Sequence, residues 1–316
     1  MKLSLCMKIH DESLRLVGQS GSNDQKGGQP VKWDRLMVDT PRGSFEVYTR
    51  GDGAPLCTTH LYSEFNETGD SLAEKFVSDR KVFLVNLKEA GNSPQVTSDD
   101  ELSMQSAVED LEAIRNTLGL DSWDFAGHST GGMLGVVYAV TRGTSLKSLI
   151  LVGSAASREY NWTDESIYHP EHPKFNRMQE LIELLKTPDL SPDRRAELTM
   201  ERTKLSLNNP ERHHEYFSGE SSKQMSIKRL NYFGTYDYPK FDVRSELATV
   251  TIPTLIMCGR CDVQCPLWCS VEMHELVQGS RLVVFEHSNH YPFLEEPVKF
   301  SEEIHSFLSA VETSSC

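Results

Sequence analysis

The stretch Trp123-Asp124-Phe125-Ala126-Gly127-His128-Ser129-Thr130-Gly131-Gly132 decides the fold of this 316-residue chain. An apolar run ends in the pattern G-x-S-x-G, and small and apolar residues at helical spacing follow at once. A strand, a sharp turn and a helix in this order are typical of a nucleophile elbow, in which a serine is held at strained backbone angles. Glycines at positions 127 and 131 leave room for the helix to pack closely. The pattern predicts Ser129 as a nucleophile.

Further apolar strands alternate with helical patterns on both sides of the elbow. A capping box, Ser98-x-x-Glu101, is predicted to open a helix that runs to Leu118 and ends at Gly119. Alternation of this kind indicates an α/β fold with a mostly parallel central sheet and helices on both faces. Ligands of such sheets bind beyond the carboxyl ends of the strands. The other predicted strands are Leu36–Thr40, Phe45–Thr49, Pro55–His60, Lys81–Asn86, Leu146–Val152, Thr254–Cys258 and Arg281–Phe285.

Three regions of different composition follow from the same patterns. Residues 1–30 are polar and rich in glycine towards their end, which predicts an extension of the fold. Residues 31–156 and 246–316 carry the strands and are expected to form one core. Residues 157–245 show helical periodicity without a continuous buried strand, and are expected to form an inserted helical cap that ends in an aromatic tract.

Charge and composition argue against several classes of partner. A formal net charge of −14 disfavours nucleic acid and anionic membrane surfaces. No apolar run approaches the roughly 18 residues of a membrane span, and the N-terminus has no signal-peptide pattern. Seven cysteines, an odd number, fit reduced thiols. We therefore expect a cytoplasmic protein that acts on a small molecule or short peptide, with no nucleic-acid or membrane partner; the oligomeric state stays open.

A serine nucleophile needs a base, and the base needs an orienting carboxylate. In this kind of sheet the order along the chain is serine, acid, histidine. Asp262 follows the strand 254–258, and His290 follows the strand 281–285. His287 is an alternative base in the same loop. The predicted catalytic residues are Ser129, Asp262 and His290.

At these motifs the chain resembles the α/β-hydrolase fold superfamily, and within it the proline iminopeptidase-like capped serine hydrolases. The resemblance covers residues 35 to 312. Gly127–Gly132 matches the nucleophile elbow, Cys258–Asp262 matches the G-x-x-D acid loop, and Ser288–Pro297 is similar to the S-G-H-x-P-F-x-E-x-P segment. That last match implies His290 as the base. A serine at the elbow excludes the epoxide hydrolase and haloalkane dehalogenase branches, which use Asp.

The resemblance also implies an oxyanion hole. One donor is the backbone N–H after the nucleophile, at Thr130, and alignment places the second at Tyr62. The chain departs from the family here, because Leu61 and Tyr62 stand where relatives carry glycines. It departs again at Leu87–Ser93, where relatives show D-x-R-G-x-G-x-S.

The sequence predicts neither a metal nor a cofactor. Cys258, Cys261, Cys265 and Cys269 form a cluster, C-x2-C-x3-C-x3-C, that matches no common zinc or iron–sulfur spacing. We interpret them as small thiols packed around the acid loop.

The resemblance favours a serine hydrolase that cleaves small amides or peptides with a free N-terminus through an acyl-enzyme. Alternatives are a carboxylesterase or lactonase, a C–C bond hydrolase with the same triad, and a non-catalytic hydrolase-like ligand receptor. The candidate substrate-binding residues are Glu64, His128, Tyr232 and Phe233.

Overall fold

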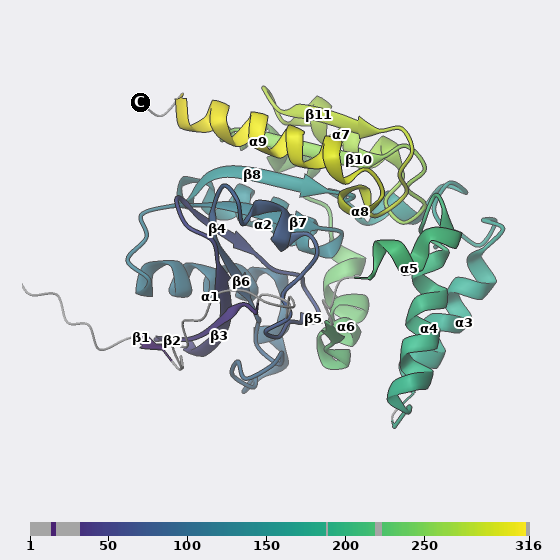
Figure 1. Cartoon of the computed structure of the whole chain (residues 1–316), viewed down its shortest axis with the longest axis horizontal. Helices are drawn as coiled ribbons and strands as arrows, with labels where there is room; N and C mark the ends of the chain where they lie inside the picture. Colours follow the sequence, from purple (N-terminus) through teal and green to yellow (C-terminus); the bar gives the residue numbers. More distant parts are fainter. Residues whose placement is uncertain (1–13, 17–31, 188, 219–222, 314–316) are drawn as a thin grey trace, which may run out of the picture.

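The computed structural model describes residues 14–16, 32–187, 189–218 and 223–313. In this part of the chain a nine-stranded sheet runs in the order β1-β2-β3-β6-β4-β7-β8-β10-β11 (Figure 1). The strands are β1 (Leu14–Leu16), β2 (Asp34–Thr40), β3 (Gly43–Arg50), β6 (Lys81–Val85), β4 (Pro55–Thr58), β7 (Trp123–His128), β8 (Leu146–Val152), β10 (Thr254–Gly259) and β11 (Arg281–Phe285).

The sheet is parallel from β6 through β4, β7, β8 and β10 to β11, and antiparallel at the β1–β2–β3 end. All six residues of β7 are buried, as expected of a strand covered on both faces. The parallel strands bring their carboxyl ends to one edge, so the loops after β7, β10 and β11 meet there. The predicted fold class is confirmed.

Helices cover both faces of the sheet and create two apolar cores. On one face pack α1 (Met104–Thr117), α2 (Thr130–Arg142) and α7 (Leu267–Leu276). On the other pack α8 (Pro292–Glu295), α9 (Pro297–Thr313) and the 3-10 helix η1 (Ala73–Phe76). The remaining short helices of the core are η2 (Asp99–Leu102), η3 (Gly143–Ser145) and η8 (Arg244–Thr249).

The predicted start of the first helix was wrong. Ser98 makes no capping hydrogen bond, and a 3-10 turn follows it. The α-helix begins at Met104, and the hydroxyl of Ser103 accepts from the Ser106 N–H instead. Glu101, the other half of the predicted capping box, pairs with Lys88. The predicted capping box does not form, because the Glu101 carboxylate is engaged by the Lys88 ammonium.

The inserted segment lies beside the carboxyl edge of the sheet, where α3 and α4 project as a pair (Figure 1). Their contact has its own small apolar cluster, formed by Leu181, Leu185 and Leu198. A two-residue strand, β9 (Gln224–Met225), pairs with β5 (Ser63–Glu64) of the core. The sequence predicts an all-helical segment, because a strand this short has no readable periodicity. Its helices are η4 (Arg158–Asn161), α3 (Phe175–Leu185), α4 (Pro192–Lys204), η5 (Pro210–Arg212), α5 (His213–Tyr216), α6 (Ile227–Tyr232), the π-helical η6 (Phe233–Asp237) and η7 (Tyr238–Lys240).

The predicted extension, residues 1–30, lies almost wholly outside the described residues. Its described part is β1, which pairs antiparallel with β2. Within the described ranges, no helix is both long and apolar enough to cross a membrane.

Candidate active site

Ser129 occupies the turn between β7 and α2 with φ 55° and ψ −123°. A positive φ in a residue other than glycine costs about 1–3 kcal/mol and persists only where the surroundings impose it. Close packing imposes it here: a Cβ on Gly127 would lie 2.3 Å from the Gly131 carbonyl carbon, and one on Gly131 would lie 2.4 Å from the Thr59 oxygen. The elbow geometry predicted for Ser129 is present, and its side chain is only partly buried.

Asp262 and His290 form a buried pair next to the elbow loop. His290 Nδ1 lies 2.9 Å from Asp262 Oδ2 and 3.0 Å from Oδ1. Oδ1 also accepts the backbone N–H groups of Gln264 and Cys265, at 2.8 and 2.9 Å. The alternative base, His287, is exposed. The carboxylate is therefore fixed by the backbone of its own loop and aimed at the His290 ring.

His128 contacts this pair through His290. Its Nε2 donates to the His290 carbonyl at 2.8 Å, and its ring packs 4.4 Å from the His290 ring, between centroids. Burial lowers the pKa of His128 well below its ordinary value, and the charge of protonated His290 lowers it further. A neutral His128 fits this position, since only one nitrogen needs to donate.

The two predicted oxyanion donors lie on segments that touch. Thr130 is the first residue of α2, where backbone N–H groups have no helical acceptor. His60 bridges the two segments: its Nε2 lies 3.1 Å from Thr130 Oγ1, and its Nδ1 lies 2.9 Å from Ser63 Oγ. His60 thus connects the loop that carries Tyr62 to the first residue of α2.

Arg229 of α6 fixes the backbone of the same loop. It is 1% exposed and donates to the carbonyl oxygens of Leu61, Lys88 and Leu102. Burial lowers its pKa to about 10. The Leu61 carbonyl and the Tyr62 N–H belong to one planar peptide, so holding the oxygen sets the direction of the N–H. The sequence showed no sign of this, because Ile227-Lys228-Arg229-Leu230 resembles the surface of a helix.

A cavity of about 380 Å³ opens under the cap beside this loop. Of the predicted substrate-binding residues, Phe233 lines the cavity, and Glu64, His128 and Tyr232 are not among its described lining residues. Tyr62, the predicted oxyanion donor, lines it too. Tyr168 links the cavity to the acid loop, since its hydroxyl donates to Gln264 Oε1 at 2.6 Å. The walls are Tyr62, Tyr160, Asn161, Tyr168, Phe175, Gln179, Ile182, Leu185, Lys186, Arg202, Met225, Ile227, Leu230, Phe233, Gly234 and Tyr238.

Sequence reasoning missed Arg202, which faces this cavity from α4. The available signal was its spacing: Leu198, Arg202 and Leu205 stand at i, i+4 and i+7, on the inward face of an amphipathic helix. A cation on such a face is unusual.

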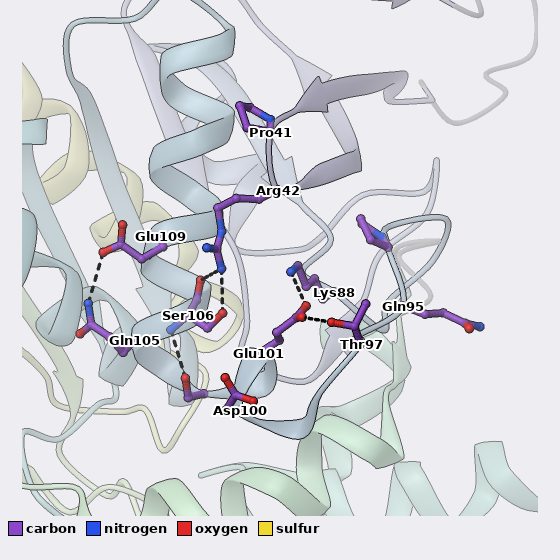
Figure 2. A pocket seen from close by; sticks show the side chains of 12 residues that line it. Pro41, Arg42, Lys88, Gln95, Thr97, Asp100, Glu101, Gln105, Ser106 and Glu109 are labelled. Atoms are coloured by element: carbon purple, nitrogen blue, oxygen red, sulfur yellow. Dashed lines mark hydrogen bonds and ion pairs between the residues drawn. The ribbon is translucent and has the colours of Figure 1, made fainter.

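A wider depression, of about 690 Å³, lies between the β2–β3 hairpin and the start of α1 (Figure 2). Its two described cations are paired: Arg42 donates to the Ser106 hydroxyl and forms an ion pair with Asp110, and Lys88 pairs with Glu101 at 2.5 Å. None of the three triad candidates is among the described lining residues of either hollow. The cap cavity is lined by the oxyanion candidate Tyr62 and the wider depression is not, so we do not treat the depression as the substrate site.

The cysteine cluster is mostly internal. Cys258, Cys265 and Cys269 are buried and Cys261 is exposed, and burial raises the pKa of the three buried thiols. Among the residues that the structure describes, no group of three His, Cys, Asp or Glu side chains is placed to hold a metal ion.

The fold and the elbow together define a class. The sequence model of the alpha/beta hydrolase fold family matches residues 56–297, and the chain belongs to that family. A solved structure of an alpha/beta fold family hydrolase from Bacillus anthracis str. Sterne is 42% identical, with a TM-score of 0.85 over 87% of this chain and 99% of that one.

Within the family, the chain is proline iminopeptidase-like. It is 26% identical to the proline iminopeptidase of Lactobacillus delbrueckii subsp. bulgaricus, over 85% of this chain and 96% of the relative. An esterase from Exiguobacterium antarcticum shares the fold, at 24% identity and a TM-score of 0.64 over 86% of this chain and 98% of that one. The chain is therefore a hydrolase with relatives among aminopeptidases and structural neighbours among esterases.

Proposed function

We propose that the chain is a serine hydrolase that cleaves a small ester or amide through Ser129, His290 and Asp262. The Ser129 hydroxyl attacks the carbonyl carbon while His290 Nε2 takes its proton. Asp262 holds His290 through Nδ1 and stabilises the imidazolium that forms. The N–H groups of Thr130 and Tyr62 stabilise the oxyanion, and removing one such donor costs roughly 3 kcal/mol.

The reaction then proceeds in two halves. Collapse of the tetrahedral intermediate breaks the bond to the leaving group, which takes the proton from His290 and departs. Water enters, gives its proton to His290 and attacks the acyl-enzyme, and the acid product leaves with Ser129 regenerated. No cofactor takes part in these steps.

One observation carries the proposal. The strained Ser129 and the Asp262–His290 pair stand on loops after β7, β10 and β11, at the same edge of the sheet. A serine that only made a turn would not need φ 55° beside an acid–histidine pair aimed by two backbone N–H groups.

The relatives favour an amide, because several are named proline iminopeptidases. A peptide with a free N-terminus presents an ammonium group, which a carboxylate would hold. The described lining of the cap cavity includes neither Asp nor Glu, and Glu64 lies outside it. This observation favours esters as the second candidate. Lactones and C–C bonds beside a ketone use the same triad.

The test is a panel of prolyl and alanyl arylamides, p-nitrophenyl esters of varied chain length, and lactones, run on the wild type and on Ser129→Ala. We expect hydrolysis of at least one class by the wild type and none by Ser129→Ala. Ser122→Ala, a change at the opposite end of β7, serves as the matched control and should keep full activity. Turnover retained by Ser129→Ala would sink the assignment. A folded wild type that hydrolyses nothing in the panel would favour the ligand receptor.

A further inference from the structure

Two cations line the cap cavity, and they differ in their partners. Lys186 pairs with Glu183, 2.7 Å away. Arg202 makes no ion pair with any carboxylate of the described residues, although the chain as a whole carries a net charge of −14. An acidic protein has carboxylates in excess, so an arginine without one at a cavity wall is unusual.

The Tyr168 hydroxyl accepts from Arg202, and no carboxylate of the described residues occupies its other donors. The guanidinium lies beside the Tyr168 hydroxyl, which already donates to Gln264 Oε1 and so offers Arg202 only lone pairs. Tyr62, Tyr160 and Tyr238 supply further phenol groups to the same cavity. A guanidinium has five N–H donors arranged as a planar fork, and a carboxylate matches that fork with two parallel hydrogen bonds.

The charge of Arg202 acts on the catalytic side of the cavity as well. Burial lowers the pKa of His60 well below its ordinary value, and the positive charges of Lys223 and Arg202 lower it further. His60 in turn contacts Thr130, the residue after the nucleophile. Lys223 is paired with Asp70 at 2.9 Å, so of these two cations Arg202 is the one with no carboxylate partner in the described part of the chain.

We propose that Arg202 binds a carboxylate of the substrate, so that the enzyme prefers an ester or amide with a second, anionic group near the scissile bond. This inference rests on the proposed hydrolase function and names its substrate class. A cation at this wall, with neither Asp nor Glu among the described lining residues, would repel the ammonium of an N-terminal peptide. It would hold a monoester or monoamide of a dicarboxylic acid, or an ester whose leaving group carries the carboxylate.

The kinetic experiment compares matched substrates that differ only in charge. On the acyl side these are mono-p-nitrophenyl glutarate and p-nitrophenyl methyl glutarate; on the leaving side, 4-butanoyloxybenzoate and its methyl ester. We expect the anionic member of one pair to have a kcat/KM about tenfold or more above its neutral partner, the size of a charge-assisted hydrogen bond. Arg202→Gln should bring that ratio close to one, and Arg202→Lys should keep part of it, since lysine keeps the charge without the fork.

Arg194→Gln is the matched control, because Arg194 is an exposed arginine of the same helix that pairs with Glu197. It should leave the ratio unchanged. Ratios near one in both pairs for the wild type, with measurable turnover, would overturn the inference and leave the hydrolase proposal standing. A ratio that survives Arg202→Gln would overturn it too.

A binding measurement keeps the two proposals separable. Calorimetry needs no turnover. It compares two anions, monomethyl glutarate and benzoate, with their neutral esters, dimethyl glutarate and methyl benzoate. We expect one anion to bind the wild type about tenfold or more tightly than its neutral ester, and Arg202→Gln to lose that difference. Equal binding of anions and neutral esters contradicts the inference. Discrimination without any hydrolysis would support the anion site and count against the hydrolase.

Discussion

The two halves of the active site are held in different ways. The acid and the base stand on loops of the core, and the carboxylate of Asp262 is aimed by backbone N–H groups two and three residues further along the chain. The loop of Tyr62 is held by the inserted segment. Arg229 donates to the Leu61 carbonyl, and the Ser226 N–H donates to the Tyr62 carbonyl at 2.9 Å. Ser63 also pairs with Met225 as β5 meets β9.

The difference teaches where this chain can vary. Elbow, acid and histidine follow from strand ends and short motifs, and the inserted segment reaches them through single backbone contacts, such as the Ser206 carbonyl that accepts from the His290 N–H at 3.2 Å. The proposed second oxyanion donor, the Tyr62 N–H, lies on a loop that the cap holds. The cap therefore shapes the catalytic site as well as the cavity, and changes on the core side and on the cap side should have distinguishable effects.

The largest effect is expected on the core side. In Asp262→Asn the side-chain oxygen can still accept the two backbone N–H groups, but the negative charge that orients and stabilises the His290 imidazolium is gone. We expect kcat to fall by roughly 10⁴, as for the equivalent change in a serine protease triad. Steady-state kinetics measure the loss, and circular dichroism should show an unchanged fold. A loss below tenfold would remove Asp262 from the triad.

On the cap side, Arg229→Met should loosen the peptide that carries the Tyr62 N–H. We expect kcat to fall by about 10- to 1,000-fold, the range for an oxyanion donor, with a smaller change in KM. The melting temperature should fall too, because three buried carbonyl groups lose their donor.

Two further variants separate positioning from mere stability. Arg229→Lys should restore part of kcat, since an ammonium can still reach one carbonyl. Lys228→Met, at the exposed neighbour that pairs with Glu89, should change neither kcat nor stability. If Arg229→Met lowers the melting temperature and leaves kcat intact at a permissive temperature, the cap does not position the donor.

The smallest effect concerns His128, whose folded-state pKa lies well below the ordinary 6.5. Between those two values the unfolded chain binds more protons than the folded one, so stability rises with pH and is lost as pH falls below about 6.5. His128→Gln removes this contribution, and the slope of unfolding free energy between pH 5 and 6.5 should become shallower by up to about 1.4 kcal/mol per pH unit. Urea unfolding at several pH values measures it. Equal slopes in both proteins would show that His128 keeps its proton on folding.

The sequence predicted the core side well and the cap side poorly, for a physical reason. Strands such as Thr254–Gly259 are largely apolar runs, and Ser129, Asp262 and His290 lie in the loops that follow β7, β10 and β11, so local patterns locate them. Arg229 and Arg202 act through residues far along the chain: Arg229 reaches Leu61, 168 positions away. No local pattern records such a contact.

The helix start at Met104 illustrates the same limit. The pattern Ser98-x-x-Glu101 is typical of a capping box, but Glu101 pairs with Lys88, a residue outside the pattern. The positions of Glu64 and Tyr232 outside the cavity lining are likewise set by how the cap lies on the core, which spacing alone does not specify.

The central claim is that Ser129 is an activated nucleophile, and covalent labelling tests it most directly. The folded protein is treated with a fluorophosphonate at neutral pH, and the intact mass and the modified peptide are determined. We predict one label per chain, on Ser129, with labelling abolished in Ser129→Ala and slowed strongly in His290→Ala. An unlabelled protein that is folded, or a label on another residue, would contradict the account.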